Sequence, residues 1–158
     1  MKHKGFSLIE CILVIAVMAI VVSVSVGGLI YLDSANANKC ASAIDSAIAT
    51  AKSETLSKAE PGNLYLYEYD GRCYVKFSKA ADFVRDANAE RVDAGRVEIS
   101  YDDGTGVKAL AGNDPLMIAF SRKDGSFTSG PQTIYVNGSD TYEIRFIRNT
   151  GKHIMKMM

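Results

Sequence analysis

The sequence predicts an α+β protein in which a long N-terminal helix packs on an antiparallel β-sheet. Residues 11–32 carry no charged side chain, and residues 33–59 contain neither proline nor glycine, so one helix can continue through both stretches. After residue 60, short alternating runs are separated by turn signals rich in glycine, asparagine and aspartate. A helix followed by strands is the order typical of this fold class.

Composition divides the chain into two regions. Of its 158 residues, 47% are apolar, which is enough for a packed core, but the apolar residues concentrate before Asp33. From Asp33 onward the chain has the composition of a soluble domain. The formal net charge is zero and the pI is near 6.7, which argues against a strongly basic nucleic-acid-binding protein.

Residues 11–32 have the length of a transmembrane helix. These 22 residues would extend about 33 Å, which matches the hydrocarbon core of a bilayer. Lys2 and Lys4 precede the run, so the positive-inside rule places the N-terminus in the cytoplasm and the rest of the chain outside. A secretory signal would need a shorter apolar run, and a lipoprotein signal would need a small residue where Glu10 precedes Cys11. A plain anchor leaves Glu10 unexplained, because a carboxylate at membrane depth is costly.

The segment "KGFSLIE" ends at Glu10 and resembles the class III signal of type IV prepilins and pseudopilins. In that signal a basic leader ends in glycine and is followed by an aromatic residue, Ser or Thr, Leu, Ile, Glu and an apolar helix. The resemblance implies cleavage between Gly5 and Phe6 by a prepilin peptidase, and N-methylation of Phe6. It also implies a pilin-like chain of three parts, namely a leader peptide at 1–5, a transmembrane and assembly helix at 6–32, and an extracytoplasmic α+β head at 33–158.

Glu10 acquires a physical role once the leader is removed. Cleavage leaves a cationic amine on Phe6, and Glu10 of one subunit can pair with the Phe6 amine of its neighbour when helices pack side by side. In a low-dielectric bundle this attraction is strong, and a shifted register would leave a charge unpaired. The alternative is an incidental glutamate at the membrane interface.

The helix is expected to continue to Ala59, because apolar residues from Cys40 to Leu56 recur at helical spacing. The segment "EPGN" at residues 60–63 then stops it. A hairpin follows in "LYLYEYDGRCYVKF", with Asp70-Gly71 as its two-residue turn. Residues 79–91 are predicted to form a short helix or an exposed loop. Further strands are predicted at 96–101, 116–121, 133–136, 141–148 and 153–156.

The tyrosines of the hairpin occupy one face of its first strand. Tyr65, Tyr67 and Tyr69 alternate with apolar leucines on the other face. An aromatic stripe of this kind can stack a ligand, but packing in the core or against another subunit is the interpretation we favour.

The three cysteines form no CxxC motif. Cys11 lies in the apolar run. Cys40 and Cys73 can form a disulfide if the head is extracytoplasmic, or they can remain two buried free thiols.

No catalytic constellation is evident, so we expect no enzymatic activity, no cofactor and no metal site. His3 and His153 are the two histidines, and His3 would leave with the leader. Asp102 and Asp103 in "YDDGTG" are interpreted as a solvated turn, since a calcium loop needs more oxygen ligands. Basic residues concentrate near the C-terminal hairpin and are candidate DNA contacts, although a solvated edge is the alternative: Arg145, Arg148, Lys152 and Lys156.

The segments "AKSETLSK", "IAFSRKDGSF" and "YEIRFIRNTGKHI" are similar to those of H-type minor pseudopilins and FimT-like minor pilins. The resemblance implies a structural, minor subunit of a type IV pilus or a type II secretion-like pseudopilus. Its expected partners are other pilin or pseudopilin subunits, a prepilin peptidase, an assembly platform membrane protein and membrane lipid. The expected location is a single pass in the cytoplasmic (inner) membrane with the head outside, and then the filament at the cell surface or in the periplasm. The alternative is a DNA-binding minor pilin of a DNA-uptake system.

Overall fold

The computed structural model describes residues 8–57, 62–93, 97–112 and 114–158, without the side chains of residues 24–32 and 80. The predicted leader at 1–5 and Phe6 lie outside the described residues. The chain divides into two compact units, with the boundary between Leu32 and Asp33. Each unit is described by itself.

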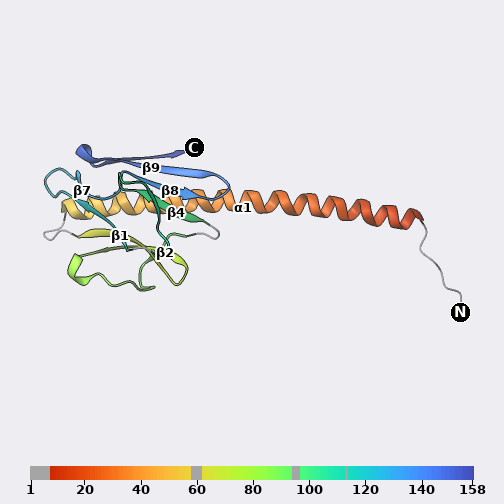
Figure 1. Cartoon of the computed structure of the whole chain (residues 1–158), viewed down its shortest axis with the longest axis horizontal. Coiled ribbons are helices and arrows are strands. Elements are labelled where there is room, and N and C mark those ends of the chain that lie inside the picture. The colour runs from red at the N-terminus through yellow and green to blue at the C-terminus, as the bar shows by residue number, and fades with distance from the viewer. Residues whose placement is uncertain (1–7, 58–61, 94–96, 113) are drawn as a thin grey trace. The chain divides into compact units, whose positions relative to one another are not determined.

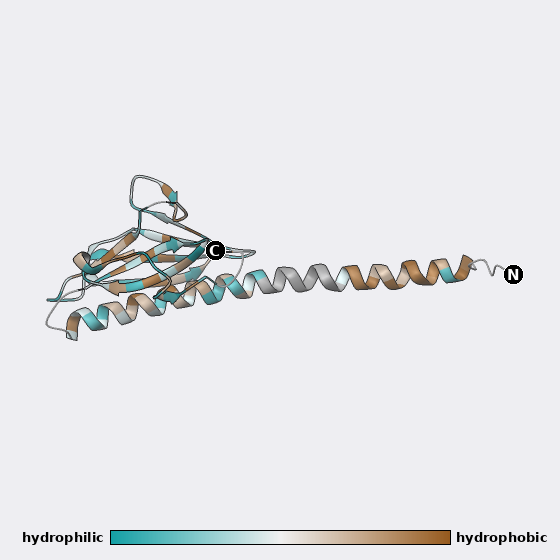
Figure 2. Ribbon diagram, turned by 90° about the horizontal axis from the view of Figure 1, so that it is seen from below, coloured by the Kyte–Doolittle hydropathy of each residue, from teal (hydrophilic) through white to brown (hydrophobic). Residues whose placement is uncertain are grey.

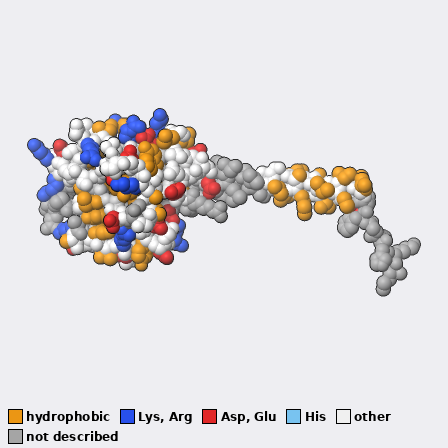
Figure 3. All heavy atoms as spheres, viewed as in Figure 1, with side chains coloured by type: hydrophobic (Ala, Val, Ile, Leu, Met, Phe, Trp, Pro, Cys, Tyr) orange, Lys and Arg blue, Asp and Glu red, His pale blue; other side chains and the backbone are white. Residues whose placement is uncertain are grey.

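The first unit is helical. Helix α1 (Leu8–Ser57) begins in it, and its described residues up to Ser23 are exposed. Apolar residues dominate this stretch, as the brown ribbon of Figure 2 and the orange spheres of Figure 3 show. Among the described residues, no helical stretch combines the length and apolarity that crossing a membrane requires. The predicted span at 11–32 includes residues 24–32, whose side chains lie outside the description.

The second unit contains the remainder of α1, which buries the predicted face. The buried α1 residues recur every three or four positions and are small or medium-sized: Ala37, Cys40, Ala41, Ile44, Ile48 and Ala51. Thr55 completes the face, and its hydroxyl donates to the Ala51 carbonyl at 2.8 Å, so its polar group is satisfied. The helix is described to Ser57, and the predicted stop at 60–63 falls partly outside the described residues.

Within the described residues, ten strands form two antiparallel sheets, so the prediction of one sheet was wrong. Sheet A has the order β3-β2-β1-β6-β7, comprising β1 (Asn63–Tyr69), β2 (Arg72–Ser78), β3 (Glu90–Arg91), β6 (Leu116–Phe120) and β7 (Phe127–Ser129). Sheet B has the order β10-β9-β8-β4-β5, comprising β4 (Glu98–Asp102), β5 (Val107–Ala109), β8 (Thr133–Asn137), β9 (Thr141–Ile147) and β10 (Lys152–Met157). Two 3₁₀ turns are η1 (Ala80–Asp82) and η2 (Arg148–Thr150).

The physical reason for two sheets is the helix itself. In Figure 1, β1 and β2 lie on one side of the second part of α1, and β9 lies on the other. One core cluster accordingly combines the buried α1 face with Leu66 and Ile118 of sheet A and Ile134 and Ile144 of sheet B. Both sheets therefore contribute residues that cover the same face of the helix.

The tyrosine stripe packs in a second, smaller core, which confirms the packing interpretation for two of its members. Tyr65 and Tyr67 are buried with Tyr74, and residues from the loop after β2 cover them. The rings of Tyr65 and Phe83 stack with centroids 4.0 Å apart, and the Tyr67 hydroxyl donates to the Asp86 carbonyl at 2.9 Å. Tyr69 remains 43% exposed. Residues 79–91, which were predicted to form a short helix or an exposed loop, contain the short helix η1 and also the strand β3, which was not predicted.

Polar contacts fasten α1 to sheet B at three levels. Near the start of the unit, the Ser34 hydroxyl donates to the carboxylate of Asp140, in the turn between β8 and β9. Farther along, Asp45 Oδ1 lies 3.1 Å from His153 Nε2 on β10. In the last turns, Lys52 Nζ donates to the Gly151 carbonyl at 2.8 Å. The helix therefore holds the hairpin formed by β9 and β10.

Gly151 tests how closely the β9–β10 hairpin approaches the backbone of the turn at Gly125. It has φ +59, and a Cβ added there would overlap the carbonyl oxygen of Gly125. Gly151→Ala should therefore lower the free energy of unfolding by about 3 kcal/mol, combining left-handed strain with a backbone clash. The control is Gly112→Ala, because Gly112 has φ +71 but open space around it, so only the strain of about 1–2 kcal/mol applies. Urea unfolding of residues 33–158 measures both, and equal losses would contradict the close approach.

Candidate functional site

The candidate functional residues of the first unit lie at the start of α1. The predicted cleavage residues Gly5 and Phe6 are outside the described residues, whereas Glu10 occupies the first turn of the helix and is exposed. A carboxylate is favourable in this position because the N-terminal end of a helix carries a partial positive charge. The structure thus places Glu10 where it can face a cation at the helix start.

The surface around Glu10 is apolar on every side of the helix. Every described residue from Leu8 to Ser23 is exposed, and eleven of them are large hydrophobic side chains: Leu8, Ile9, Ile12, Leu13, Val14, Ile15, Val17, Met18, Ile20, Val21 and Val22. A contiguous exposed apolar surface indicates contact with lipid or with other protein. Whatever covers it must also accommodate the charge of Glu10.

A comparison with known families bears directly on this segment. The family model described as the prokaryotic N-terminal methylation motif matches residues 1–26. The chain carries a prokaryotic N-terminal methylation motif. This finding is consistent with the type IV pilin and pseudopilin family and confirms the resemblance seen in "KGFSLIE". No curated protein and no solved structure matches the chain.

The methylation motif spans Gly5, Phe6 and Glu10. In general it implies a membrane-anchored protein associated with a pilus at the cell surface or in the periplasm. The pilin-like proteins that carry it are structural rather than enzymatic. The motif covers the start of the chain, so the remaining candidate sites rest on the second unit's own geometry.

The cysteines of the second unit are free and buried. Cys40 on α1 and Cys73 on β2 belong to the same core cluster. Burial, with a smaller contribution from the charge of Cys73, raises the pKa of Cys40 to about 12. Burial, with a smaller contribution from Glu68, raises the pKa of Cys73 to about 12 as well. Neutral buried thiols are poor nucleophiles, and the disulfide between them stays a prediction.

These thiols predict a loss of stability in alkali. Below the ordinary thiol pKa of 9.0, both the folded and the unfolded chain hold the protons, so the stabilisation is fully present. As pH rises from 9 toward 12, only the unfolded chain releases them, which lowers the free energy of unfolding by up to about 1.4 kcal/mol per pH unit for each thiol. Urea unfolding of reduced residues 33–158 at pH 8, 9 and 10 measures the slope. Cys40→Ala/Cys73→Ala should flatten it, and an unchanged slope would assign it to other groups.

The four basic residues that are candidate DNA contacts divide into two that line a cavity and two that do not. Arg145 and Arg148 line a cavity of about 280 Å³ together with Gln132, Thr133 and Phe146. Lys152 and Lys156 project from β10 and do not line this cavity. The charge of Arg145 is partly offset, because its guanidinium lies 2.7 Å from Glu143. The Arg148 guanidinium donates to the Gly130 carbonyl at 3.3 Å.

The acidic segment after β4, which was predicted to be a solvated turn, is a turn in which both aspartates accept hydrogen bonds from backbone amides. The Gly104 amide donates to Asp102 at 2.8 Å, and the Thr105 amide donates to Asp103 at 3.0 Å. Hydrogen bonds from Lys108 and Thr105 hold the pKa of Asp103 well below its usual range. In the described parts of the chain, no group of three or more metal-binding side chains has a geometry suited to a metal ion.

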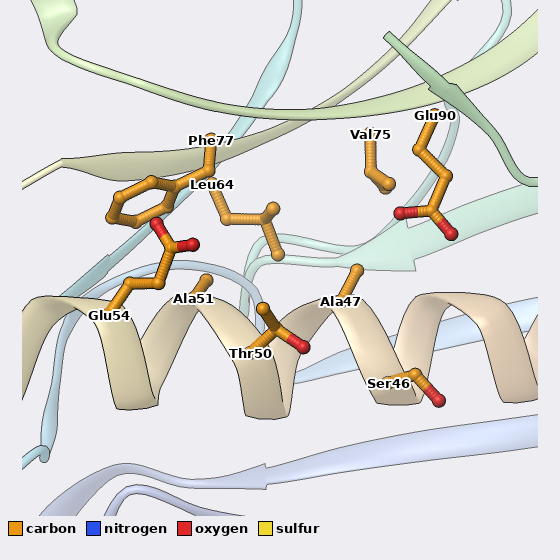
Figure 4. A pocket seen from close by; sticks show the side chains of 9 residues that line it. All are labelled: Ser46, Ala47, Thr50, Ala51, Glu54, Leu64, Val75, Phe77 and Glu90. Carbon is orange, nitrogen blue, oxygen red and sulfur yellow. The ribbon is translucent and has the colours of Figure 1, made fainter.

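A groove lies between α1 and sheet A, and no local pattern in the sequence predicts it. This groove, which we call the α1 groove, has a volume of about 170 Å³. Figure 4 shows its lining, which comprises Ser46, Ala47, Thr50, Ala51 and Glu54 from α1, Leu64 from β1, Val75 and Phe77 from β2, and Glu90 from β3. These residues come from four separate elements, and the short strand β3 has no alternating pattern by which to predict it.

Proposed function

We propose that the protein is a structural, minor subunit of a type IV pilus or of a type II secretion-like pseudopilus. The observation that carries the proposal is the methylation motif at residues 1–26, which continues into a helix whose described apolar residues are exposed. In this proposal a prepilin peptidase cleaves after Gly5, and the subunit enters the filament by packing α1 against the helices of its neighbours.

Before assembly, the apolar run at residues 11–32 is proposed to cross the cytoplasmic membrane once, with the head at 33–158 outside. The charges support this topology, because Lys2 and Lys4 precede the run and Asp33 is the first charge after it. Lipid covers the apolar helix surface at this stage, and an assembly platform protein transfers the subunit to the filament.

The pairing of Glu10 with a neighbour's Phe6 amine is proposed to set the register of assembly. Each charge is costly when it is left alone among apolar helices, and their attraction is strong in a low dielectric. Glu10 lies in the first turn of α1, near the position that the cleaved N-terminus would occupy. A neighbouring helix shifted by a turn would lose the pair, so only one register satisfies both charges.

A second candidate function is a DNA-binding minor pilin of a DNA-uptake system. The cavity lined by Arg145 and Arg148 supports it, because two guanidinium groups beside Gln132 and Thr133 can receive a phosphate. Glu143 weighs against it by pairing with Arg145. DNA binding by residues 33–158 that weakens steeply with salt, and that is lost in Arg145→Ala/Arg148→Ala, would favour this function.

Processing is the first test of the proposed function. Intact-mass and peptide analysis of the membrane-extracted protein should find a chain that begins at N-methylated Phe6. Gly5→Val should leave the leader attached, because a side chain at this position obstructs the peptidase, while the conservative control Ile9→Leu should be processed normally. A mature chain that keeps Met1–Gly5 would overturn the proposal.

Assembly is the second test, and Glu10 is the residue to change. Glu10→Ala and Glu10→Gln should be exported and cleaved normally but recovered in sheared filaments at least about tenfold less than the wild type, since an unpaired buried charge costs more than about 1.4 kcal/mol. Glu10→Asp should lie between, because it keeps the charge and loses reach. Quantitative immunoblots of filament and membrane fractions measure the ratio. Equal recovery of Glu10→Gln and wild type would make Glu10 an incidental interfacial residue.

A further inference from the structure

Strand β10 carries three side chains with metal-binding atoms on one of its sides. They alternate along the strand and therefore point to the same side of sheet B: His153, Met155 and Met157. That side is the inner one, because their partners on β9 are all buried, namely Phe146, Ile144 and Tyr142. β10 is an edge strand, which lies beside β9 and ends near the C-terminus in Figure 1. The three side chains therefore lie at the rim of the core, where solvent can reach them.

The two thioether groups of β10 are exposed although they are on the inner side of the sheet. Met155 is 36% exposed and Met157 is 56% exposed, whereas Ile144 and Val136 on the inner side of the neighbouring strands are fully buried. An exposed methionine turns freely about its side-chain bonds, so its sulfur can move toward a ligand. Methionine is also concentrated here, since positions 155, 157 and 158 hold three of the six in the chain. The strand therefore presents soft sulfur donors to solvent.

His153 adds an imidazole nitrogen to the same side of the strand. Its Nε2 lies 3.1 Å from Oδ1 of Asp45 on α1, and its side chain is 14% exposed. A carboxylate beside Nε2 favours the proton on that nitrogen, so the lone pair of the neutral ring is on Nδ1. Histidines that bind metals have this arrangement, in which a carboxylate orients the ring and the other nitrogen is the ligand. His153 is therefore oriented as a metal ligand would be.

Thioether and imidazole groups together select a soft cation. Thioether sulfur favours copper(I), whereas magnesium and calcium prefer carboxylate and carbonyl oxygen. Among the residues that the structure describes, no group of three or more His, Cys, Asp or Glu side chains is suited to a metal ion. The expectation of no metal site rested on histidine and carboxylate residues, whereas the donors on β10 are mainly thioethers. A soft monovalent cation can be held by two such donors.

The spacing of residues along a strand decides which of these donors can share one ion. Residues two positions apart are separated by about 6.8 Å, so the side chain of Met155 can meet that of either neighbour at an ion between them. His153 and Met157 are about 13–14 Å apart, which is too far for their side chains to reach the same ion. Met155 is therefore the shared donor, and either neighbour can supply the second one.

We propose that β10 binds copper(I) through the sulfur of Met155 and a second donor, which is either Nδ1 of His153 or the sulfur of Met157. The carboxylate of Asp45 orients the imidazole ring and offsets the positive charge of the ion. All of these residues belong to the second unit, so the inference does not depend on the proposed role as a filament subunit.

Titration of the full chain with silver(I), in detergent micelles and a chloride-free buffer, tests the proposal. Silver(I) is a soft monovalent cation like copper(I), and it keeps its oxidation state during the titration. Cys11 is an exposed thiol that would compete for the ion, so the titration uses Cys11→Ala. The methionine methyl resonances of Met155 and Met157 should shift in ¹³C spectra, while that of Met117 on β6 stays in place. Shifts of Met117 alone, or of no methionine, would overturn the proposal.

Variants in the same background separate the shared donor from its neighbours, with copper(I) affinity measured anaerobically against a competing chelator. Met155→Leu keeps the volume of the side chain and should weaken binding at least about tenfold, while the control Met117→Leu should leave it unchanged. His153→Gln and Met157→Leu should each retain binding, because the other neighbour remains. The double variant His153→Gln/Met157→Leu should lose binding as Met155→Leu does. Equal affinities of Met155→Leu and the unsubstituted background would overturn the site.

Zinc tests whether the sulfur atoms are the groups that recognise the ion. Zn²⁺ is bound by imidazole and carboxylate groups, whereas thioethers favour copper(I). An equimolar amount of zinc should therefore leave the Met155 and Met157 methyl resonances in place and should not displace silver(I). Displacement of silver(I) by zinc would assign the binding to His153 and Asp45 and would overturn the thioether site.

Discussion

The second unit depends on one packing constraint: a single helix face must fill the space between two sheets. Alanine and cysteine at positions 37, 40, 41 and 51 keep that face narrow enough for strands to approach from both sides, and Ile44 and Ile48 supply most of the apolar area. Interiors of this kind are close-packed, so the positions of β1 and β9 follow from the shape of α1. The contact of Asp45 with His153 and the hydrogen bond from Lys52 to the Gly151 carbonyl then fix the last hairpin.

The same packing produces the surfaces that other molecules can use. A groove remains between α1 and sheet A, and it is lined by residues of α1, β1, β2 and β3. The polar side chains named next make their contacts within the chain. The carboxylates of Asp102 and Asp103 close a turn, and the thiols of Cys40 and Cys73 are buried and protonated. The features that remain available for contact with other molecules are the shape of the surface, its apolar residues and the order of its charged residues.

The features that could be predicted from the sequence are those that one short segment specifies by itself. Asp70-Gly71 adopts positive φ at both positions, 51° and 67°, as the hairpin turn requires, and it joins β1 to β2 as the predicted two-residue turn. The spacing of Cys40, Ile44 and Ile48 identified the buried helix face. The features that could not be predicted are those in which several segments, distant in the sequence, come together. β3, β5 and β7 have two or three residues each, too few for alternation to be visible, so the place of Glu90 in the α1 groove could not be derived. The division into two sheets depends on which distant strands pair, such as β1 with β6 and β4 with β8, and local patterns do not specify that pairing.

The methylation motif is proposed to direct cleavage by the prepilin peptidase, and this cleavage allows the membrane-anchored chain to become a filament subunit. The most direct measurement compares cells with and without an active prepilin peptidase, following the wild-type chain through shearing and membrane fractionation. We expect the chain to reach the sheared fraction only when the peptidase is active, and to stay in the membrane otherwise. The same distribution in both cells would contradict it.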